Sequence, residues 1–166
     1  TVIGAAAGDA LLTGIRNTVV GYCALGASTA VNKTVIIGQG ACETANVTAH
    51  ADGTVAIGND AMAYLLTGRY NTAVGFEALK TNVDGDGNTA VGYQALETFE
   101  ADADGHGENT AIGYNAMQAV TTGTENTTVG KSAGDVITSG DGNIIIGKAS
   151  NPSANVGSNQ TVIGYG

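Results

Sequence analysis

Seven acidic residues lie between positions 84 and 108 with no basic residue among them: Asp84, Asp86, Glu97, Glu100, Asp102, Asp104 and Glu108. The run Asp-Ala-Asp-Gly-His-Gly-Glu at 102–108 places alternate carboxylates near a glycine turn, and Ca²⁺ binds hard oxygen ligands on tight bends. The run lacks the complete twelve-residue calcium-loop pattern. A solvated acidic loop whose Asp-Gly pairs make turns is therefore the favoured interpretation, with a calcium site as the alternative.

Other reactive side chains are few. The two histidines, His50 and His106, are separated by three copies of the repeat described below, or roughly 14 Å at the spacing of stacked strands, so one metal ion cannot bind both. Cys23 and Cys42 occupy different places in the repeat, which favours two free thiols over a disulfide. We find no nucleophile elbow, phosphate loop or metal-binding histidine pair. We expect no catalytic residue, no cofactor and no resident metal, and thus no enzyme.

Two recurrent side-chain types could bind a ligand. Aromatic residues recur at Tyr22, Phe76, Tyr93, Tyr114 and Tyr165, each just after a glycine. Such rings can stack on sugars when exposed, although covering the edge of the core is the favoured role. Threonine recurs at Thr18, Thr72, Thr89, Thr110, Thr127 and Thr161, which raises ice binding. Val35, Val55 and Ile144 interrupt this series and its neighbouring column is Ala or Val, so ice binding is the least favoured function.

The composition excludes several classes of protein. The chain has 166 residues with 26 glycines, one proline and no tryptophan, and its 15 acidic residues against 6 basic ones give a net charge of -9. Nucleic acid is an unfavourable partner for such a chain because a phosphate-binding surface needs positive charge. No apolar run approaches the length of about 18 residues that a membrane-spanning helix requires, so we expect no membrane insertion.

A short repeat positions all of these residues. The string Asn-Thr-Ala-Val-Gly-Phe-Glu-Ala-Leu at 71–79 returns with small changes at 17–25, 88–96 and 109–117. Alignment on its glycine gives ten copies, at Gly4, Gly21, Gly38, Gly58, Gly75, Gly92, Gly113, Gly130, Gly147 and Gly164. Their separations are 17 residues except for one of 20 and one of 21. The chain is therefore expected to form one repeat domain over 1–166, with loop insertions near 43–53 and 97–108.

Each column of the repeat carries a structural prediction. The residue before the glycine is Val or Ile in every copy, as expected of a buried strand position. The third residue after it is Ala or Ser, which indicates close neighbours. Asn at the fourth position before it predicts side chains that bond turn backbone and one another. Two glycine-marked corners per period predict two strands per coil. The fold class predicted is all-β, a parallel β-solenoid of about ten coils, forming a rod about 45 Å long.

Both faces of the predicted strand are largely apolar. Beside the Val/Ile column runs a second apolar column from Val2 and Val19 to Val162, and adjacent strand residues point to opposite faces. A narrow coil has only one inside, so we expect another chain to cover the remaining face. The predicted partner is the protein itself, with a homotrimer about the long axis favoured; a wider monomeric coil is the alternative.

The strings Asn-Thr-Ala-Val-Gly-Tyr-Gln-Ala-Leu and Gly-Arg-Tyr-Asn-Thr-Ala-Val-Gly-Phe-Glu-Ala-Leu resemble repeats of phage tail fibre and tail spike proteins and of related bacterial surface proteins. They are also similar in kind to the shorter repeats of the trimeric autotransporter adhesin head, a left-handed parallel β-roll. The resemblance spans the chain and implies an extracellular shaft or head on a virion tail or cell surface. The 17-residue period exceeds that of the adhesin head, which weakens the transfer of handedness and trimer geometry.

We therefore expect a non-catalytic structural rod of an extracellular fibre. One alternative is a subunit of a filament that stacks head to tail, because the sequence opens with Thr-Val-Ile-Gly and closes within another copy of that motif. The second alternative is a spike that binds or cleaves glycans, with a host-surface glycan or receptor as its partner.

Overall fold

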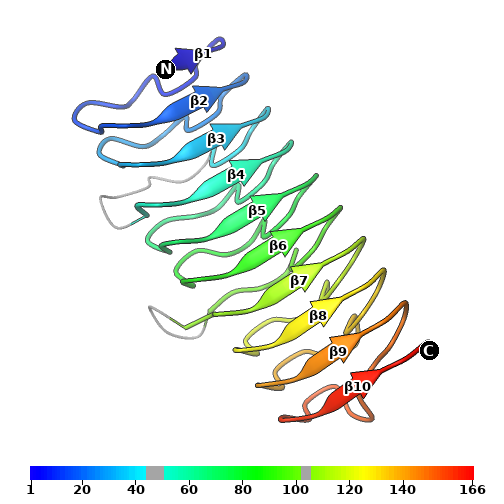
Figure 1. The fold of residues 1–166 in the computed structure, drawn as a ribbon. Helices are drawn as coiled ribbons and strands as arrows, with labels where there is room; N and C mark the ends of the chain where they lie inside the picture. Colours follow the sequence, from blue (N-terminus) through cyan, green and yellow to red (C-terminus); the bar gives the residue numbers. More distant parts are fainter. Residues whose placement is uncertain (44–50, 102–105) are drawn as a thin grey trace.

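The structure is a computed structural model that describes residues 1–43, 51–101 and 106–166. Its ten strands are β1 (Val2–Ile3), β2 (Thr18–Val20), β3 (Val35–Ile37), β4 (Val55–Ile57), β5 (Thr72–Val74), β6 (Thr89–Val91), β7 (Thr110–Ile112), β8 (Thr127–Val129), β9 (Ile144–Ile146) and β10 (Thr161–Ile163). They form a single sheet in chain order, and every pair of neighbours is parallel. The strands stack like rungs along the molecule (Figure 1). The predicted all-β parallel solenoid is confirmed.

The register never shifts along the stack. Thr72 pairs with Thr89 one period of 17 residues later, as the alignment on glycine requires. Across the two longer separations, Val35 still pairs with Val55 and Thr89 with Thr110. Both insertions thus leave the strand stack intact, although their central residues, 44–50 and 102–105, lie outside the described part of the chain.

The inside of the coil is filled by columns of small and medium side chains. Each of the strands β2 to β9 buries its middle residue; Val19, Ala73 and Ala90 are examples, each 0% exposed. The Ala column that follows the glycine, for which the sequence indicates close neighbours, is buried, and so is the Leu or Met after it, such as Leu79 and Met117. Stacked small residues let the two sides of a narrow coil approach closely, so the core is continuous along the rod.

The prediction that the Val/Ile column before the glycine is buried is wrong. In β2 to β9 that residue is half-buried or exposed, and it points away from the core together with the first residue of the strand. Alternate strand residues point to opposite faces, so burying the middle residue forces both of its neighbours outward. The smaller residue goes inside because the coil is narrow.

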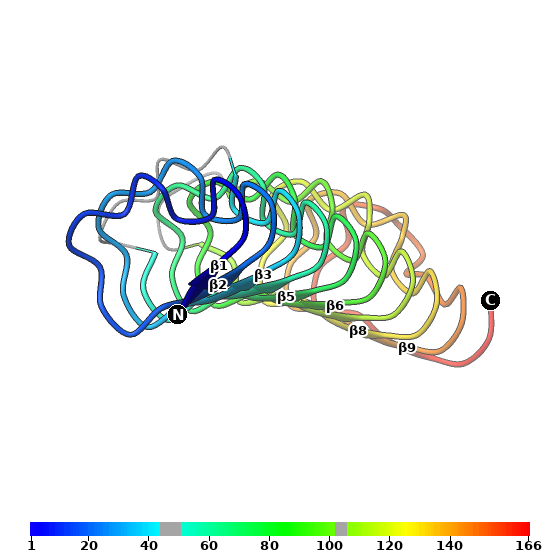
Figure 2. The ribbon, with the colours of Figure 1, turned by 90° about the horizontal axis from the view of Figure 1, so that it is seen from above.

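The prediction of two strands per coil is also wrong for the described residues. Each coil has one strand, and the remainder is turns that form the opposite side of the molecule (Figure 2). Residues two and four after the glycine take left-handed backbone conformations, as at Glu77 (φ 52°) and Leu79 (φ 53°). An extended strand cannot contain such residues, so the chain curls after each corner.

The Asn column forms a buried ladder of hydrogen bonds, as predicted. Asn126 Oδ1 accepts bonds from the backbone N–H and the Nδ2 of Asn143, both at 2.9 Å. Asn126 Nδ2 donates to Asn109 Oδ1 at 3.1 Å and to the Gly140 carbonyl at 2.8 Å. Thr34 and Thr54 interrupt the ladder, and Thr54 Oγ1 is buried without a partner. The amides tie each turn to the next without entering the sheet.

The repeat glycine makes the corner of each coil possible. Gly92 has φ 140°, and a Cβ added there would lie 2.6 Å from the carbonyl carbon of Gly113 in the next coil. An L-residue would be strained by the backbone conformation and blocked by the neighbouring backbone. These glycines are structural. Within the described ranges, no helix is long and apolar enough to cross a membrane.

Candidate functional site

The most regular surface of the molecule is the outward side of the sheet, which we call the outer sheet face. It consists of the first and third residues of strands β2 to β10, for example Thr72 with Val74 and Thr89 with Val91. Every side chain on this face is Thr, Val or Ile, and none is charged. Because the register is constant, each column presents similar groups once per coil.

This face changes how the threonine series is interpreted. The series Thr72, Thr89, Thr110 and Thr127 is continuous over β5 to β8 and points outward. The Ala column beside it, which counted against ice binding in the sequence, is inside the core. The outward neighbour is instead the β-branched column before the glycine. The Ala and Val residues next to the threonines in the sequence therefore do not belong to this surface.

A second surface lies at the corner after each strand, where the aromatic residues form a ladder. The rings of Phe76 and Tyr93 stack with centroids 5.1 Å apart, and those of Tyr93 and Tyr114 are 5.0 Å apart. The Lys131 Nζ lies 5.3 Å from the Tyr114 ring centroid. The three rings remain 39–49% exposed, so they lie at the surface of the corner and leave the favoured role of covering the edge of the core a prediction.

The stacking also limits what the aromatic ladder can bind. A sugar stacks on the face of an aromatic ring. Tyr93 lies between Phe76 and Tyr114, which occupy its two faces, and Lys131 lies over Tyr114. These contacts stabilise the corner of successive coils and compete with a sugar for the ring faces.

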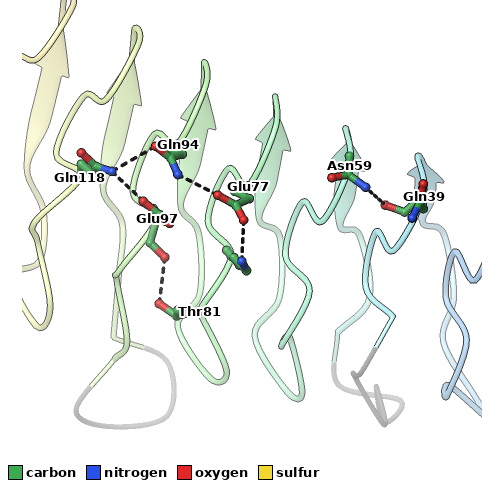
Figure 3. Close-up of polar contacts among 8 residues, drawn as sticks. Gln39, Asn59, Glu77, Thr81, Gln94, Glu97 and Gln118 are labelled. Carbon is green, nitrogen blue, oxygen red and sulfur yellow. Dashed lines mark hydrogen bonds and ion pairs between the residues drawn. The ribbon is translucent and has the colours of Figure 1, made fainter.

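Beside the ladder, polar side chains connect three coils in a network that sequence reasoning missed (Figure 3). Gln94 Nε2 donates to Glu77 Oε2 at 2.7 Å, and Gln118 Nε2 donates to Gln94 Oε1 at 3.2 Å and to Glu97 Oε2 at 2.7 Å. The hydrogen bond from Lys80 Nζ, 2.6 Å from Glu77 Oε1, is the main reason why the pKa of Glu77 is lowered. The network pairs the carboxylates of Glu77 and Glu97 with donors from neighbouring side chains, an arrangement that links successive coils.

A similar contact joins the two coils that directly precede the coil of Glu77. Asn59 Nδ2 donates to the backbone carbonyl of Gln39 at 3.1 Å (Figure 3). A signal for the Glu77–Gln94 contact existed in the sequence, because polar residues recur two positions after the glycine at Asp60, Glu77, Gln94 and Asn115. Without knowing that this position points outward, the pattern could not be assigned to contacts between coils.

The acidic residues are distributed rather than gathered. Asp84 Oδ1 accepts from the Thr67 hydroxyl and Asp86 Oδ1 from the backbone N–H of Arg69, both at 2.6 Å, so each aspartate bridges two coils. Burial, followed by the charge of Asp84, raises the pKa of Glu100. Among the residues with described positions, no three His, Cys, Asp or Glu side chains come together as metal ligands.

The remaining members of the predicted calcium site are placed only in part. Asp102 and Asp104 lie outside the described residues, as does His50, which is not part of the predicted site. His106 and Glu108 are exposed and line an open depression together with Glu125. A calcium site at 102–108 therefore stays a prediction that the described geometry leaves open.

The cysteines are both free thiols. Cys42 is buried in the core, and burial raises its pKa to about 12. A thiol with so high a pKa is protonated at neutral pH and is a poor nucleophile. The favoured interpretation of two unpaired thiols is confirmed.

In comparisons with known proteins, no family model, no curated protein and no solved structure matches the chain. The class of architecture, a single-sheet parallel β-solenoid, rests on the strand topology alone.

Proposed function

We propose that this protein is a non-catalytic structural rod. The observation that supports the proposal is the unbroken parallel stack of ten strands, in which each coil contacts only its neighbours. Such quasi-one-dimensional architectures extend in one direction and hold their surfaces at fixed spacing. Buried amide hydrogen bonds reinforce the same axis, for instance between Asn109, Asn126 and Asn143.

We further propose that the rod is part of an extracellular fibre, as a phage tail shaft or as the head of a cell-surface adhesin. Support comes from the resemblance of the Asn-Thr-Ala-Val-Gly repeats to repeats of those proteins. The polar network that links successive coils and the fully buried thiol of Cys42 are compatible with a role without chemistry.

Electron microscopy of the purified chain tests the rod. The expected particles are short rods of about 45 Å per chain. Compact globular particles would contradict the proposal, and long filaments would favour the head-to-tail alternative. Immunogold labelling of virions and cells from the source tests the location: labelling along tails or at the cell surface supports an extracellular fibre, whereas labelling confined to the cell interior contradicts it.

The homotrimer is also a proposal, since one chain leaves the outer sheet face uncovered. Sedimentation equilibrium decides it directly. A mass three times that of the 16.4 kDa chain supports the trimer, and a stable monomer at micromolar concentration removes it.

A further inference from the structure

The central part of the outer sheet face carries a repeating pair of side chains. Over β5 to β8, threonine stands at the first outward position and Val or Ile at the third, with the registers Thr72–Thr89, Thr89–Thr110 and Thr110–Thr127. Each coil therefore displays one hydroxyl and several methyl groups. Thr18 and Thr161 repeat the arrangement near the two ends of the stack.

The positions of these groups are fixed more firmly than those of ordinary surface side chains. The hydrogen-bonded strands set the spacing along the rod at about 4.8 Å. Val, Ile and Thr are branched at Cβ and are stiff about χ1. Their middle neighbours, such as Ala90 and Ala111, are fully buried, which anchors each strand to the core. The face is a rigid array of hydroxyl and methyl groups with one period.

The shape and charge of the face restrict its partner. Two columns, separated by about 7 Å along the strand and extending over about 45 Å, give roughly 300 Å². A standard protein interface buries about 800 Å² on each partner, so this strip alone is small for a tight protein complex. No charge is present to attract an ionic ligand, although the chain as a whole carries a net charge of -9. A partner that matches the face must itself be periodic and uncharged.

We propose that the outer sheet face binds ice. The spacing of the strands is close to the distance between next-nearest oxygen atoms in the ice lattice. Threonine hydroxyls donate and accept hydrogen bonds to lattice water, and the adjacent methyl groups order the water between them. This function goes beyond that of the structural rod and does not depend on it. It requires the face to be free, and it therefore excludes the homotrimer proposed above, in which a sister chain covers the same face.

The test compares the purified chain with two variants. In the first, Thr89→Tyr and Thr110→Tyr are combined, which places two large rings in the centre of the face. The matched control, Thr29→Tyr, makes the same change at an exposed threonine outside the strands. Circular dichroism melting confirms that each variant is folded; if the double variant is not, Thr110→Tyr alone replaces it.

Thermal hysteresis and the uptake of fluorescently labelled protein into a slowly growing ice front are then measured. We expect the original chain and the control to give hysteresis and to enter the ice, and the double variant to lose at least about tenfold in hysteresis at equal concentration. Absence of both signals in the original chain overturns the proposal. So does a double variant that keeps full activity, or sedimentation showing an oligomer that the double variant dissociates, which would assign the face to a second copy. Whatever the outcome for ice binding, electron microscopy tests the proposed rod independently.

Discussion

The Asn ladder allows a quantitative test of what holds the coils together. Replacing Asn126 by Ala removes four buried side-chain hydrogen bonds, two to Asn143 and one each to Asn109 and Gly140. A buried hydrogen bond contributes about 1 kcal/mol net, and a buried partner left unsatisfied costs about 1–3 kcal/mol. We expect Asn126→Ala to lower the free energy of unfolding by about 3–5 kcal/mol.

The assay is equilibrium guanidinium unfolding followed by far-UV circular dichroism. Asn155→Ala is the matched control, because Asn155 is exposed and its backbone carbonyl, rather than its side chain, accepts a hydrogen bond from Thr138. The control is expected to stay within about 0.5 kcal/mol of the original chain. If the two variants were destabilised equally, the amide ladder would not be a main source of stability.

A second substitution at the same position separates hydrogen bonding from size. Asn126→Asp keeps the shape and the acceptor but cannot donate to Gly140 when ionised. Burial raises the pKa of a carboxyl group, so the penalty is present above that raised pKa and is relieved as the pH falls through it. Relative to the original chain measured at each pH, the variant should recover stability on acidification. A penalty independent of pH would refute this reasoning.

Three further outcomes are expected. Gly92→Ala should lower the free energy of unfolding by about 3 kcal/mol or more, because the new residue would have a positive φ and its Cβ would clash with the backbone of the next coil. In the control Gly26→Ala the nearest atom to the new Cβ would be 3.3 Å away, so this variant should unfold at nearly the original guanidinium midpoint. Thr54→Asn should restore the amide ladder and raise stability by about 1 kcal/mol, and an unchanged midpoint would contradict that. In the folded protein, a thiol-reactive dye should label half-buried Cys23 and leave Cys42 unmodified until denaturant is added; equal labelling rates would show that the core opens readily.

The parts of the fold that the sequence predicts are those in which one residue type has one physical role. Gly at the corner, Ala in the crowded interior and Asn in the ladder each recur because few other residues satisfy a strained backbone, a short distance or a buried amide bond. The register of Val35 with Val55 across an insertion follows from the same alignment. These assignments needed only the repeat and the chemistry of its side chains.

The orientation of the strand could not be decided in this way. Alternation in a strand has a period of two, and here both phases are apolar, so hydropathy does not distinguish inside from outside. Strand propensity favours the Val/Ile column as the buried one. The width of the coil, however, decides which column faces inward, and a narrow coil has room for the smaller residues. The buried Ala78 and Ala95 after the corner were a usable signal, because they show that this interior accepts small residues.

The second strand was predicted from glycine spacing, and the conformation of non-glycine residues overturned it. Left-handed backbone at residues such as Gln94 (φ 50°) and Leu96 (φ 52°) is uncommon for these types. Hydrogen bonds to neighbouring coils, such as Gln94 N–H to the Phe76 carbonyl at 2.9 Å, support it. Because stacking supplies these bonds, a single copy of the repeat does not reveal the conformation.

The ten copies also show which surface is able to recognise a partner along its whole length. The position after the glycine varies freely: Gln39, Asn59, Phe76 and Lys131 all occupy it. The outer sheet face keeps to Thr, Val and Ile in every described strand from β2 to β10. Strand propensity favours β-branched residues at these positions, and the constant register repeats them once per coil along the whole face. The two candidates that have the same translational repeat as the rod are a crystal lattice and a second rod. Whether a second chain covers this face therefore decides between a free monomer that binds ice and an assembled fibre.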